Sequence, residues 1–481
     1  MNRALKGALI LMAIALFLCP AGSYSLPLSF QLLGPDPIKG FNDNAISVLT
    51  SDGRHLWAGT GGGVTRSIGD PTLSENWVTY TRDHGLCGNS ISVIAVGPVV
   101  GSDGTVWTAS VGDTLIGQDE LLYGAGYGFS RPPYEEFGCL GQPGDTPVQN
   151  VTYDIAINGD TLWSANWGGG LRTCTEGCDE SPENWRKIIL DDIPIDPTDP
   201  RGHVSFSVQA WDQWVWVGTA EGVYYSDDGG STWTNRDSLY GISGEFVVSL
   251  EVQFLEDGFC IWAGTNPTHT GQVSGVSVSC DTGQTWQTFL TGYIGEGAWN
   301  FAFQDTTVWI ATSRGLFKTD NFGQSWDQFT TSHGLPSSEV YSVAVLNDTV
   351  YAGTLDGLAY TFDDGQTWGF LRISVPTAFL DEMTSYAYPN PFSPGREELG
   401  VKIRYSLKSD AVVTVRIYDW SLDLVKTIAA GHVTPEDNGQ ELLEFWDGRN
   451  DDGRVAANGV YFYKIETDRG DEAWGKIVVL D

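Results

Sequence analysis

The chain has 481 residues, of which 61 are acidic and 26 basic, so its formal net charge at pH 7 is −35. A surface this acidic repels phosphate backbones and anionic lipid headgroups, which argues against nucleic acid or a membrane surface as a partner. Gly (59 residues) and Trp (19) are abundant, Met (3) is scarce and only 18% of residues are charged, a composition that indicates many turns and an all-β protein.

The first segment has the layout of a secretory signal peptide. Residues 1–6 form a short basic segment, residues 8–18 form an unbroken apolar run, and small residues follow at positions 21, 22, 23 and 25. The run is too short to span a bilayer as a helix. Cys19 raises the alternative of a lipoprotein, but the two residues before it are large where that signal needs small ones. We therefore predict a signal peptide over residues 1–25 and a secreted or cell-surface chain without a membrane span.

A short apolar strand with a central aromatic residue recurs seven times, from LWAGT at 56–60 to VYAGT at 350–354. Successive aromatic residues lie 50, 56, 53, 46, 47 and 42 positions apart, and most copies are flanked by other alternating or apolar runs. Four short strands per unit at such a period are typical of a propeller blade. We therefore predict a seven-bladed β-propeller over residues 26–375. The aromatic residues are Trp57, Trp107, Trp163, Trp216, Trp262, Trp309 and Tyr351.

A second motif, Ser/Thr-x-Asp/Asn-x-Gly-x-Ser/Thr-Trp, follows the third strand of the last four units. Its short polar side chain can bond the amides of its own turn, its Gly allows a positive φ, and its Trp anchors the hairpin. The motif resembles the Asp-box (BNR) repeat of sialidase-like and sortilin-like propellers, which implies a structural turn on the face away from the ligand. The longer frame at 333–361 is similar to two-component-regulator propeller repeats. The motif residues are Ser226, Asp228, Gly230, Trp233, Ser279, Asp281, Gly283, Trp286, Asn321, Gly323, Trp326, Asp363, Gly365 and Trp368.

A different module follows the repeats. Residues 376–385 are predicted to be a linker, and alternating strands at 401–407 and 412–419 begin a second β domain. Short alternating strands over about 100 residues suit an Ig-like sandwich, which we assign to residues 386–481.

Four short motifs in this module resemble two known families. They are YPNPF at 388–392, WDG at 446–448, NGVY at 458–461 and the terminal KIVV at 476–479. They resemble the Ig-like domain of flagellar hook-capping proteins and the C-terminal sorting domains of type IX secretion. The second resemblance implies that the module engages a secretion machinery and directs export through an outer membrane.

The sequence carries no catalytic or metal signature. The six His form neither HExxH nor a Cys/His metal spacing, and no Gly-x-Ser-x-Gly elbow or phosphate loop occurs. Cys174 and Cys178 are spaced for a local disulfide or for half of a metal site. The acidic run at 447–452 is not a calcium loop, because Arg449 stands in a ligand position. We therefore predict no metal and no cofactor.

Catalysis is the less favoured alternative. The sialidase branch of the Asp-box resemblance implies an arginine cluster and an Arg-Ile-Pro motif, and this chain has few Arg and no such motif. Two facing carboxylates suffice for glycoside hydrolysis, however, and among 61 acidic residues some pair faces any cleft. A glycoside hydrolase or lyase therefore stays open beside the non-catalytic prediction.

The longest connections predict the ligand face. In a propeller the second-to-third and fourth-to-first connections share one face, opposite the turn motifs, and long loops on a rigid scaffold usually carry recognition. Four insertions, among them 132–148 and 266–275, are assigned to that face. Their aromatic and acidic side chains suit sugars or a protein patch, with core packing as the alternative, above all for Trp211 and Trp299. The candidates are Tyr123, Tyr127, Tyr134, Trp167, Asp191 and Asp192.

Strand register predicts one disulfide. Aligning the fifth repeat on the fourth places Ile261 opposite Ser279, and one residue outward on each strand lie Cys260 and Cys280. Opposed residues on antiparallel strands lie about 4.5–5.5 Å apart, within disulfide reach. An oxidising compartment favours the disulfide over two free thiols. The pairing of the other four cysteines, Cys87, Cys139, Cys174 and Cys178, stays open.

These expectations combine into an exported protein that recognises or scaffolds a glycan or a protein ligand without catalysis. Its propeller and its C-terminal domain are expected to fold as separate units, the second serving export or anchoring. A sensor role is a weaker alternative, because regulator propellers usually continue into a membrane helix and a kinase whereas this sequence ends at Asp481.

Overall fold

The computed structural model describes most of the chain after residue 36. Contacts divide the chain into Met1–Pro35 and Asp36–Asp481, and only the second unit is described below. The predicted signal peptide, most of the predicted linker, Asp191 and Asp192 lie outside the described residues. The described ranges are 37–41, 43–97, 104–116, 119–144, 150–190, 204–267, 273–372, 385–388, 392, 394, 400–405, 411–433, 442–470 and 472–479.

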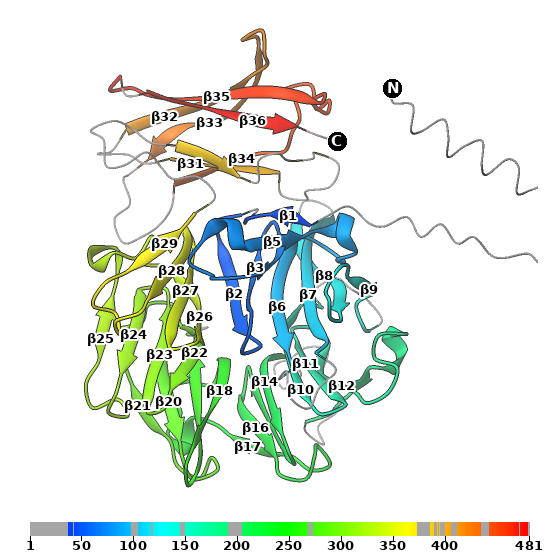
Figure 1. Ribbon diagram of the computed structural model, residues 1–481, viewed down its shortest axis with the longest axis vertical. Coiled ribbons are helices and arrows are strands. Elements are labelled where there is room, and N and C mark those ends of the chain that lie inside the picture. Colours follow the sequence, from blue (N-terminus) through cyan, green and yellow to red (C-terminus); the bar gives the residue numbers. More distant parts are fainter. Residues whose placement is uncertain are drawn as a thin grey trace, which may run out of the picture. The chain divides into compact units, whose positions relative to one another are not determined.

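Seven antiparallel sheets follow one another in the described chain between residues 38 and 371, in the order of the colours from blue to yellow (Figure 1). Each consists of four consecutive strands, and the first has a fifth at its outer edge. The first three sheets are β1 (Ile38–Lys39), β5 (Trp77–Tyr80), β4 (Gly63–Ser67), β3 (Leu56–Thr60) and β2 (Ile46–Ser51); β6 (Ser90–Val96), β7 (Val106–Ile116), β8 (Asp119–Ser130) and β9 (Gly138–Leu140); and β10 (Thr152–Asn158), β11 (Thr161–Asn166), β12 (Gly170–Cys174) and β13 (Arg186–Lys187).

The other four sheets keep the same order. They are β14 (Ser205–Trp211), β15 (Trp214–Thr219), β16 (Gly222–Ser226) and β17 (Thr234–Arg236); β18 (Val247–Leu255), β19 (Gly258–Thr265), β20 (Gly275–Ser279) and β21 (Gln287–Phe289); β22 (Ala298–Gln304), β23 (Thr307–Thr312), β24 (Gly315–Thr319) and β25 (Asp327–Phe329); and β26 (Val340–Leu346), β27 (Thr349–Thr354), β28 (Gly357–Thr361) and β29 (Gly369–Leu371). Short 3-10 helices lie between strands at Ser74–Asn76, Arg82–His84, Pro182–Asn184, Ser238–Tyr240 and Thr331–His333.

The first strands of the sheets form a closed ring. Each of β2, β6, β10, β14, β18 and β22 packs against the first strand of the next sheet, and β26 packs against β2. The chain is therefore an all-β protein built on a β-propeller, with the first strands around its central channel.

The recurring aromatic residue lies on the second strand of each sheet and is buried in all seven. The residue that ends most copies closes the turn to the third strand: Thr60 Oγ1 donates to Gly63 O (3.0 Å) and Thr312 Oγ1 donates to Gly315 O (2.7 Å). In the third sheet Asn166 Nδ2 replaces the hydroxyl. Thr219, Thr265 and Thr354 make the equivalent bond. The repeat is therefore recognisable in the sequence, because its aromatic residue fills the core and its last residue closes the turn to the third strand.

The turn motif forms a closed hydrogen-bond network. Ser226 Oγ donates to Asp228 Oδ1 (2.8 Å), and the same oxygen accepts from Thr232 N (2.8 Å). Gly230 N donates back to Ser226 Oγ (2.8 Å). These bonds, with the Thr232 amide first, stabilise the ionised carboxylate and lower the pKa of Asp228 to about 2. The same network recurs around Asp281, Asn321 and Asp363.

The motif also joins neighbouring sheets. Gly230 has a φ of +87°, and a Cβ there would lie 2.5 Å from the ring of Trp163 in the preceding sheet. The motif's Trp233 packs on the same ring, with centroids 6.3 Å apart. Gly283, Gly323 and Gly365 stand in the same way against Trp216, Phe289 and Phe329. The Gly is thus required by both backbone conformation and space.

Residues Arg131, Pro132 and Pro133 stand where the sequence of the second repeat would place its fourth strand, but in the structure they lie before that strand. Strand β9 pairs with β8, with Cys139 opposite Gly128. The cis Pro132–Pro133 bond therefore belongs to the third-to-fourth turn, on the face of the turn motifs. The assignment of the whole insertion 132–148 to the opposite face is wrong for its first part. Residues 132–137 precede the fourth strand of this sheet, which consists of the three residues Gly138–Leu140.

Three disulfides cross-link the described propeller. Ile261 lies opposite Ser279, and Cys260 is bonded to Cys280 with the Cα atoms 4.1 Å apart, as the register predicts. The pairs that the sequence left open are Cys87–Cys139 and Cys174–Cys178.

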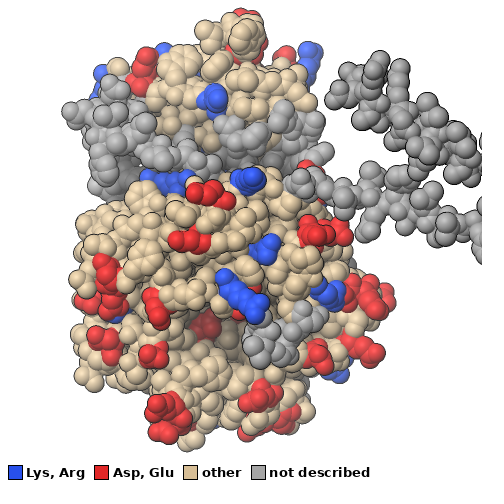
Figure 2. Space-filling model, viewed as in Figure 1, with Lys and Arg blue, Asp and Glu red and all other residues tan. Residues whose placement is uncertain are grey.

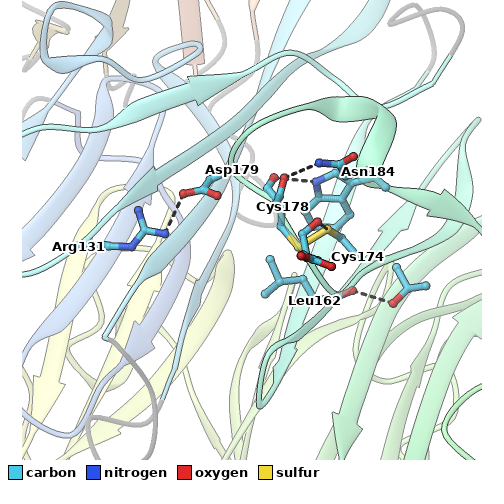
Figure 3. Close-up of a disulfide and its surroundings, with 10 residues drawn as sticks. Arg131, Leu162, Cys174, Cys178, Asp179 and Asn184 are labelled. Carbon is cyan, nitrogen blue, oxygen red and sulfur yellow. Dashed lines mark hydrogen bonds and ion pairs between the residues drawn. A yellow bond between two sulfur atoms is a disulfide. The ribbon is translucent and has the colours of Figure 1, made fainter.

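The Cys174–Cys178 disulfide closes a short loop beside an ion pair between sheets (Figure 3). Arg131 Nη2 of the second sheet lies 2.8 Å from Asp179 Oδ2 of the third. Trp185 Nε1 donates to Cys178 O (3.0 Å). Since both sulfur atoms are used in the disulfide, the alternative of half a metal site does not apply in this state.

The C-terminal segment contains two sheets around a core of its own. One has the order β30 (Ser385–Tyr388), β31 (Val401–Tyr405) and β34 (Leu442–Trp446); the other is β33 (Leu424–Val433), β32 (Ala411–Tyr418), β35 (Gly459–Thr467) and β36 (Glu472–Val479). Trp446, Ile403, Val415, Tyr463 and Ile477 are among its buried residues. Within the described chain, no hydrophobic cluster combines these residues with propeller residues.

Candidate functional site

A cavity of about 570 Å³ lies in the central channel of the propeller. All seven first strands contribute to its wall, each with residues from its N-terminal half. Trp167 and Asn266 from second-to-third connections and Phe246 from a fourth-to-first connection complete the wall. The cavity therefore opens toward the face opposite the turn motifs.

Each first strand carries a β-bulge at the same point. The register against the second strand shifts by one residue between Thr152 and Asp154 in β10, and at the corresponding place in the other six. A bulge leaves one residue unpaired and changes the direction of its side chain. The seven bulge residues, all in the cavity wall, are Ser47, Ser92, Tyr153, Phe206, Val248, Trp299 and Tyr341.

Polar side chains at and beside the bulges tie each blade to the next. Ser92 Oγ donates to Thr152 O (2.7 Å) and Ser249 Oγ donates to Ala298 O (2.7 Å). Asp154 Oδ2 accepts from Val208 N (2.8 Å). These bonds fix the position of the wall, so the cavity is preformed by the ring.

Four aromatic side chains gather on one side of the mouth. Phe206 is the centre: its ring centroid lies 5.8 Å from Tyr153, 5.5 Å from Trp167 and 4.4 Å from Phe246. Trp167 is 39% exposed and Tyr153 38% exposed. Exposed, mutually packed rings at a cavity mouth offer flat apolar faces to a ligand. We call Tyr153, Trp167, Phe206 and Phe246 the aromatic rim.

Two carboxyl groups lie deeper in the same cavity. Asp154 follows the bulge of β10, and Glu251 lies on β18, with β14 between them. Burial raises the pKa of Asp154 to about 7, although the amides of Val208 and Ile155 favour its ionised form. Burial, and then the negative charge of Asp154, raises the pKa of Glu251 to about 8. The described wall residues include no Lys, Arg or His to balance either charge.

Of the predicted ligand contacts, the structure places Trp167 in the cavity wall. Tyr123 lies in the β7–β8 hairpin opposite Gly112 and is half-buried. Trp299, for which core packing was the alternative, also lies in the wall, whereas Trp211 is partly buried and packs with Trp214 and Phe259 against the core of the fourth and fifth sheets.

Two predicted contacts lie elsewhere. Tyr127 is fully buried, and its hydroxyl donates to Ser164 Oγ (2.9 Å), so it belongs to the core between the second and third sheets. Tyr134 is buried against Trp57 in the turn that follows β8. Both expectations as ligand contacts are wrong, because Tyr127 is a mid-strand residue and Tyr134 lies on the face of the turn motifs. Asp191 and Asp192 fall outside the described residues.

Sequence reasoning missed the residues on the first strands themselves. Tyr153, Phe206, Asp154 and Glu251 stand in apolar runs that are typical of buried strands, and none of them lies in a long loop. An alignment of the seven first strands by the residue that pairs with the recurring aromatic would have shown Glu251, which stands where the other repeats have small residues or a neutral amide.

Comparison with known proteins indicates the fold. No protein-family model and no curated protein matches the chain. An ancestral GH74 enzyme matches with a TM-score of 0.52 at 13% identity, over 92% of this chain and 63% of that one. The extracellular domain of a putative one-component system from B. thetaiotaomicron matches with a TM-score of 0.50 at 15% identity, over 91% of this chain and 57% of that one.

This chain therefore spans less than two thirds of the length of either structure. PorZ, a surface component of the type-IX secretion system of Porphyromonas gingivalis, gives a TM-score of only 0.38 at 15% identity, over 91% of this chain and 75% of that one. Identities this low show the β-propeller fold and leave the function to the site. Among the described residues, no helix is both long and apolar enough to cross a membrane, and no three potential ligands cluster as a metal site.

Proposed function

We propose that the chain is an exported recognition protein that binds a glycan or a protein segment at the channel mouth without catalysis. The observation that carries the proposal is the aromatic rim, in which Tyr153 and Trp167 are exposed beside a preformed cavity on the face opposite the structural turns. Rigid aromatic faces around a concave site are typical of ligand binding.

Export is part of the proposal. It rests on the signal-like first segment, on the resemblance of the C-terminal motifs to sorting domains, and on the three disulfides, which form in oxidising compartments. The likeness to an extracellular domain agrees with it. In a host with a matching secretion system, deleting residues 386–481 is expected to leave the propeller in the periplasm, and normal surface delivery would contradict the export role.

Array binding tests the recognition role. The mature chain, which lacks the predicted signal peptide of residues 1–25, is applied to glycan and peptide arrays. The affinity for each hit is then measured for the wild type, Trp167→Ala and Trp420→Ala. Trp420 is 80% exposed on the C-terminal segment and serves as the matched control. Trp167→Ala is expected to weaken binding at least about tenfold, because it removes a rim face, whereas Trp420→Ala leaves binding unchanged. Equal affinities for all three proteins would reject the channel mouth as the site.

The second candidate is a glycoside hydrolase. It is favoured by the pair Asp154 and Glu251, whose raised pKa values are those expected of proton donors near neutral pH. The likeness to a GH74 enzyme is compatible with it but shows only the fold. Turnover of an array-identified glycan, lost in Glu251→Gln and in Asp154→Asn, would establish hydrolysis; binding without any new reducing ends would leave the non-catalytic role.

A further inference from the structure

We propose that the ligand inserts a cationic group on an alkyl stem, an ammonium or guanidinium, between the carboxyl groups of Asp154 and Glu251. The inference rests on the proposed function and adds the chemistry of what is recognised. The same chemistry is found in a Lys or Arg side chain of a polypeptide and in a free small amine.

The propeller does not need a carboxyl group at position 251. Glu251 lies opposite Trp262, the recurring aromatic residue of its sheet. The residues opposite the other six aromatic residues are Thr50, Ala95, Ala156, Gln209, Ala302 and Ala344. Five small residues and one neutral amide satisfy the same position, so the acid has a purpose other than building the blade.

Charge balance in the cavity is incomplete. Asp154 is held by two backbone amides, whereas Glu251 has no hydrogen-bond partner among the described residues. Two carboxylates in an apolar surrounding repel each other and are costly without a counter-charge. Since the described wall supplies no basic side chain, the missing cation has to come from outside, as a proton or as a ligand.

A polar group without a hydrogen-bond partner also lies on the strand between the two acids. Ser207 lies on β14, the strand between theirs, is only 4% exposed and belongs to the cavity wall. Its hydroxyl has no partner among the described residues, and the same holds for the indole nitrogen of Trp299 across the cavity. A buried polar group without a partner is uncommon in proteins and is normally satisfied by water or ligand.

The aromatic rim fits the rest of such a ligand. A cation that approaches Asp154 and Glu251 from solvent meets the exposed rings of Trp167 and Tyr153, whose faces attract positive charge and whose apolar surface covers an alkyl stem. Acidic side chains are also spread over the surface in Figure 2 and outnumber Lys and Arg in the chain. A net charge of −35 concentrates cations around the protein.

Binding of defined probes to the mature chain tests the inference. The probes are the capped peptide Ac-Gly-Lys-Gly-NH2, its arginine and norleucine counterparts, and free 1-pentylamine, titrated at about pH 9.5, above the raised pKa values of both acids and below that of the lysine ammonium. The lysine and arginine peptides are expected to bind at least about tenfold more tightly than the norleucine peptide, because only they carry the charge. Tighter binding of the peptides than of 1-pentylamine assigns the ligand to a polypeptide, and equal binding assigns it to small amines.

Glu251→Gln and Glu256→Gln separate the site from the general charge. Both remove one acid from the same blade, but Glu256 is exposed in the turn between β18 and β19, outside the cavity wall. Glu251→Gln is expected to weaken binding of the lysine peptide about tenfold, and Glu256→Gln leaves it unchanged. Equal binding of the norleucine peptide, or equal effects of the two variants, would overturn the inference.

The outcome also separates this inference from the proposed function. A neutral glycan that binds the wild type and loses affinity in Trp167→Ala would keep recognition at the channel mouth and reject the cationic group. If the wild type binds none of the probes and none of the array ligands, both the cationic group and recognition at the channel mouth are rejected.

Discussion

The bulge residues show how single side chains distinguish the blades of this propeller. The backbone repeats the same bulge in every first strand, yet the bulge residue is Ser in the first two sheets and aromatic in four others. Because the hydrogen bonds of the ladder do not involve this side chain, its identity can change without loss of the blade. Specificity of the cavity is therefore set by a few residues on one side of the ring, around Tyr153 and Phe206.

The pH dependence of stability reports on Glu251. Its pKa is raised from 4.5 to about 8 in the folded chain, so the folded state binds a proton that the unfolded state releases near pH 4.5. Proton binding therefore stabilises the folded state, and this contribution is lost as the pH rises through that window. Glu251→Gln carries no charge, so at alkaline pH it should be more stable than the wild type by roughly 2–5 kcal/mol, the upper figure being that for full burial of the carboxylate.

Unfolding by denaturant between about pH 5 and pH 9 measures the difference. Of the groups that share the cavity with Glu251, Asp154 also titrates in this range, because burial raises its pKa to about 7, whereas burial raises the pKa of Tyr153 above its usual value of 10. They are present in both proteins, and Glu256→Gln should follow the wild type. A difference in free energy of unfolding between Glu251→Gln and the wild type that stays constant with pH would contradict the prediction.

Two adjacent glycines separate backbone strain from contact between blades. Gly229 and Gly230 both have positive φ, +72° and +87°, but only a Cβ on Gly230 meets another group, the ring of Trp163 at 2.5 Å. Gly229→Ala is expected to cost about 1 kcal/mol, the price of a left-handed conformation. Gly230→Ala should cost a further 1–3 kcal/mol or so, because the ring must move. Equal losses in denaturant unfolding would show that the motif does not brace the preceding blade.

At the level of elements, the β19–β20 hairpin combines a long loop with a disulfide. Cys260 and Cys280 lie just outside the register pair Ile261 and Ser279 and are 20 residues apart in sequence. The bond restricts the unfolded chain, so the double variant Cys260→Ser/Cys280→Ser should lower the free energy of unfolding by about 2–4 kcal/mol. Non-reducing peptide mapping verifies the bond in the wild type. Unchanged stability of the double variant would mean that the blade is held by packing alone.

The second-to-third and third-to-fourth turns differ from the bulges in what a sequence reveals about them. Both are closed by a side chain within a few residues, such as Thr312 on Gly315 or Ser226 on Asp228 and Gly230. A local hydrogen bond needs fixed spacing, so these turns are visible as motifs. The bulges are invisible in the same sequence, because they depend on pairing between whole strands.

On the scale of the molecule, the propeller and the C-terminal segment have separate cores. The cluster around Trp446 and Tyr463 contains only C-terminal residues, and the propeller clusters contain none of them. Limited proteolysis is expected to cut within residues 376–385 and to leave two stable fragments, because each retains its own buried surface. Mass spectrometry identifies the fragments, and resistance to cleavage there, with one cooperative unfolding transition, would contradict separate folding.

The sequence by itself determined the propeller, its second strands and its turns. Buried Trp at a near-constant period, and Asp, Thr and Gly at fixed local spacing, express interactions that span few residues, as does the register that predicted Cys260 opposite Cys280. The same reasoning erred on Tyr127 and Tyr134, because exposure of an aromatic residue depends on what the neighbouring sheet places over it.

Only the tertiary structure decided where the candidate site lies. Asp154 and Glu251 are 97 positions apart in sequence, on strands that look like ordinary core, and they share a cavity because the ring brings every first strand to one channel. Their raised pKa values, like the aromatic rim, arise from burial among residues of several blades. Local spacing fixes turns and blades, whereas the closure of the ring creates the channel, and with it the site.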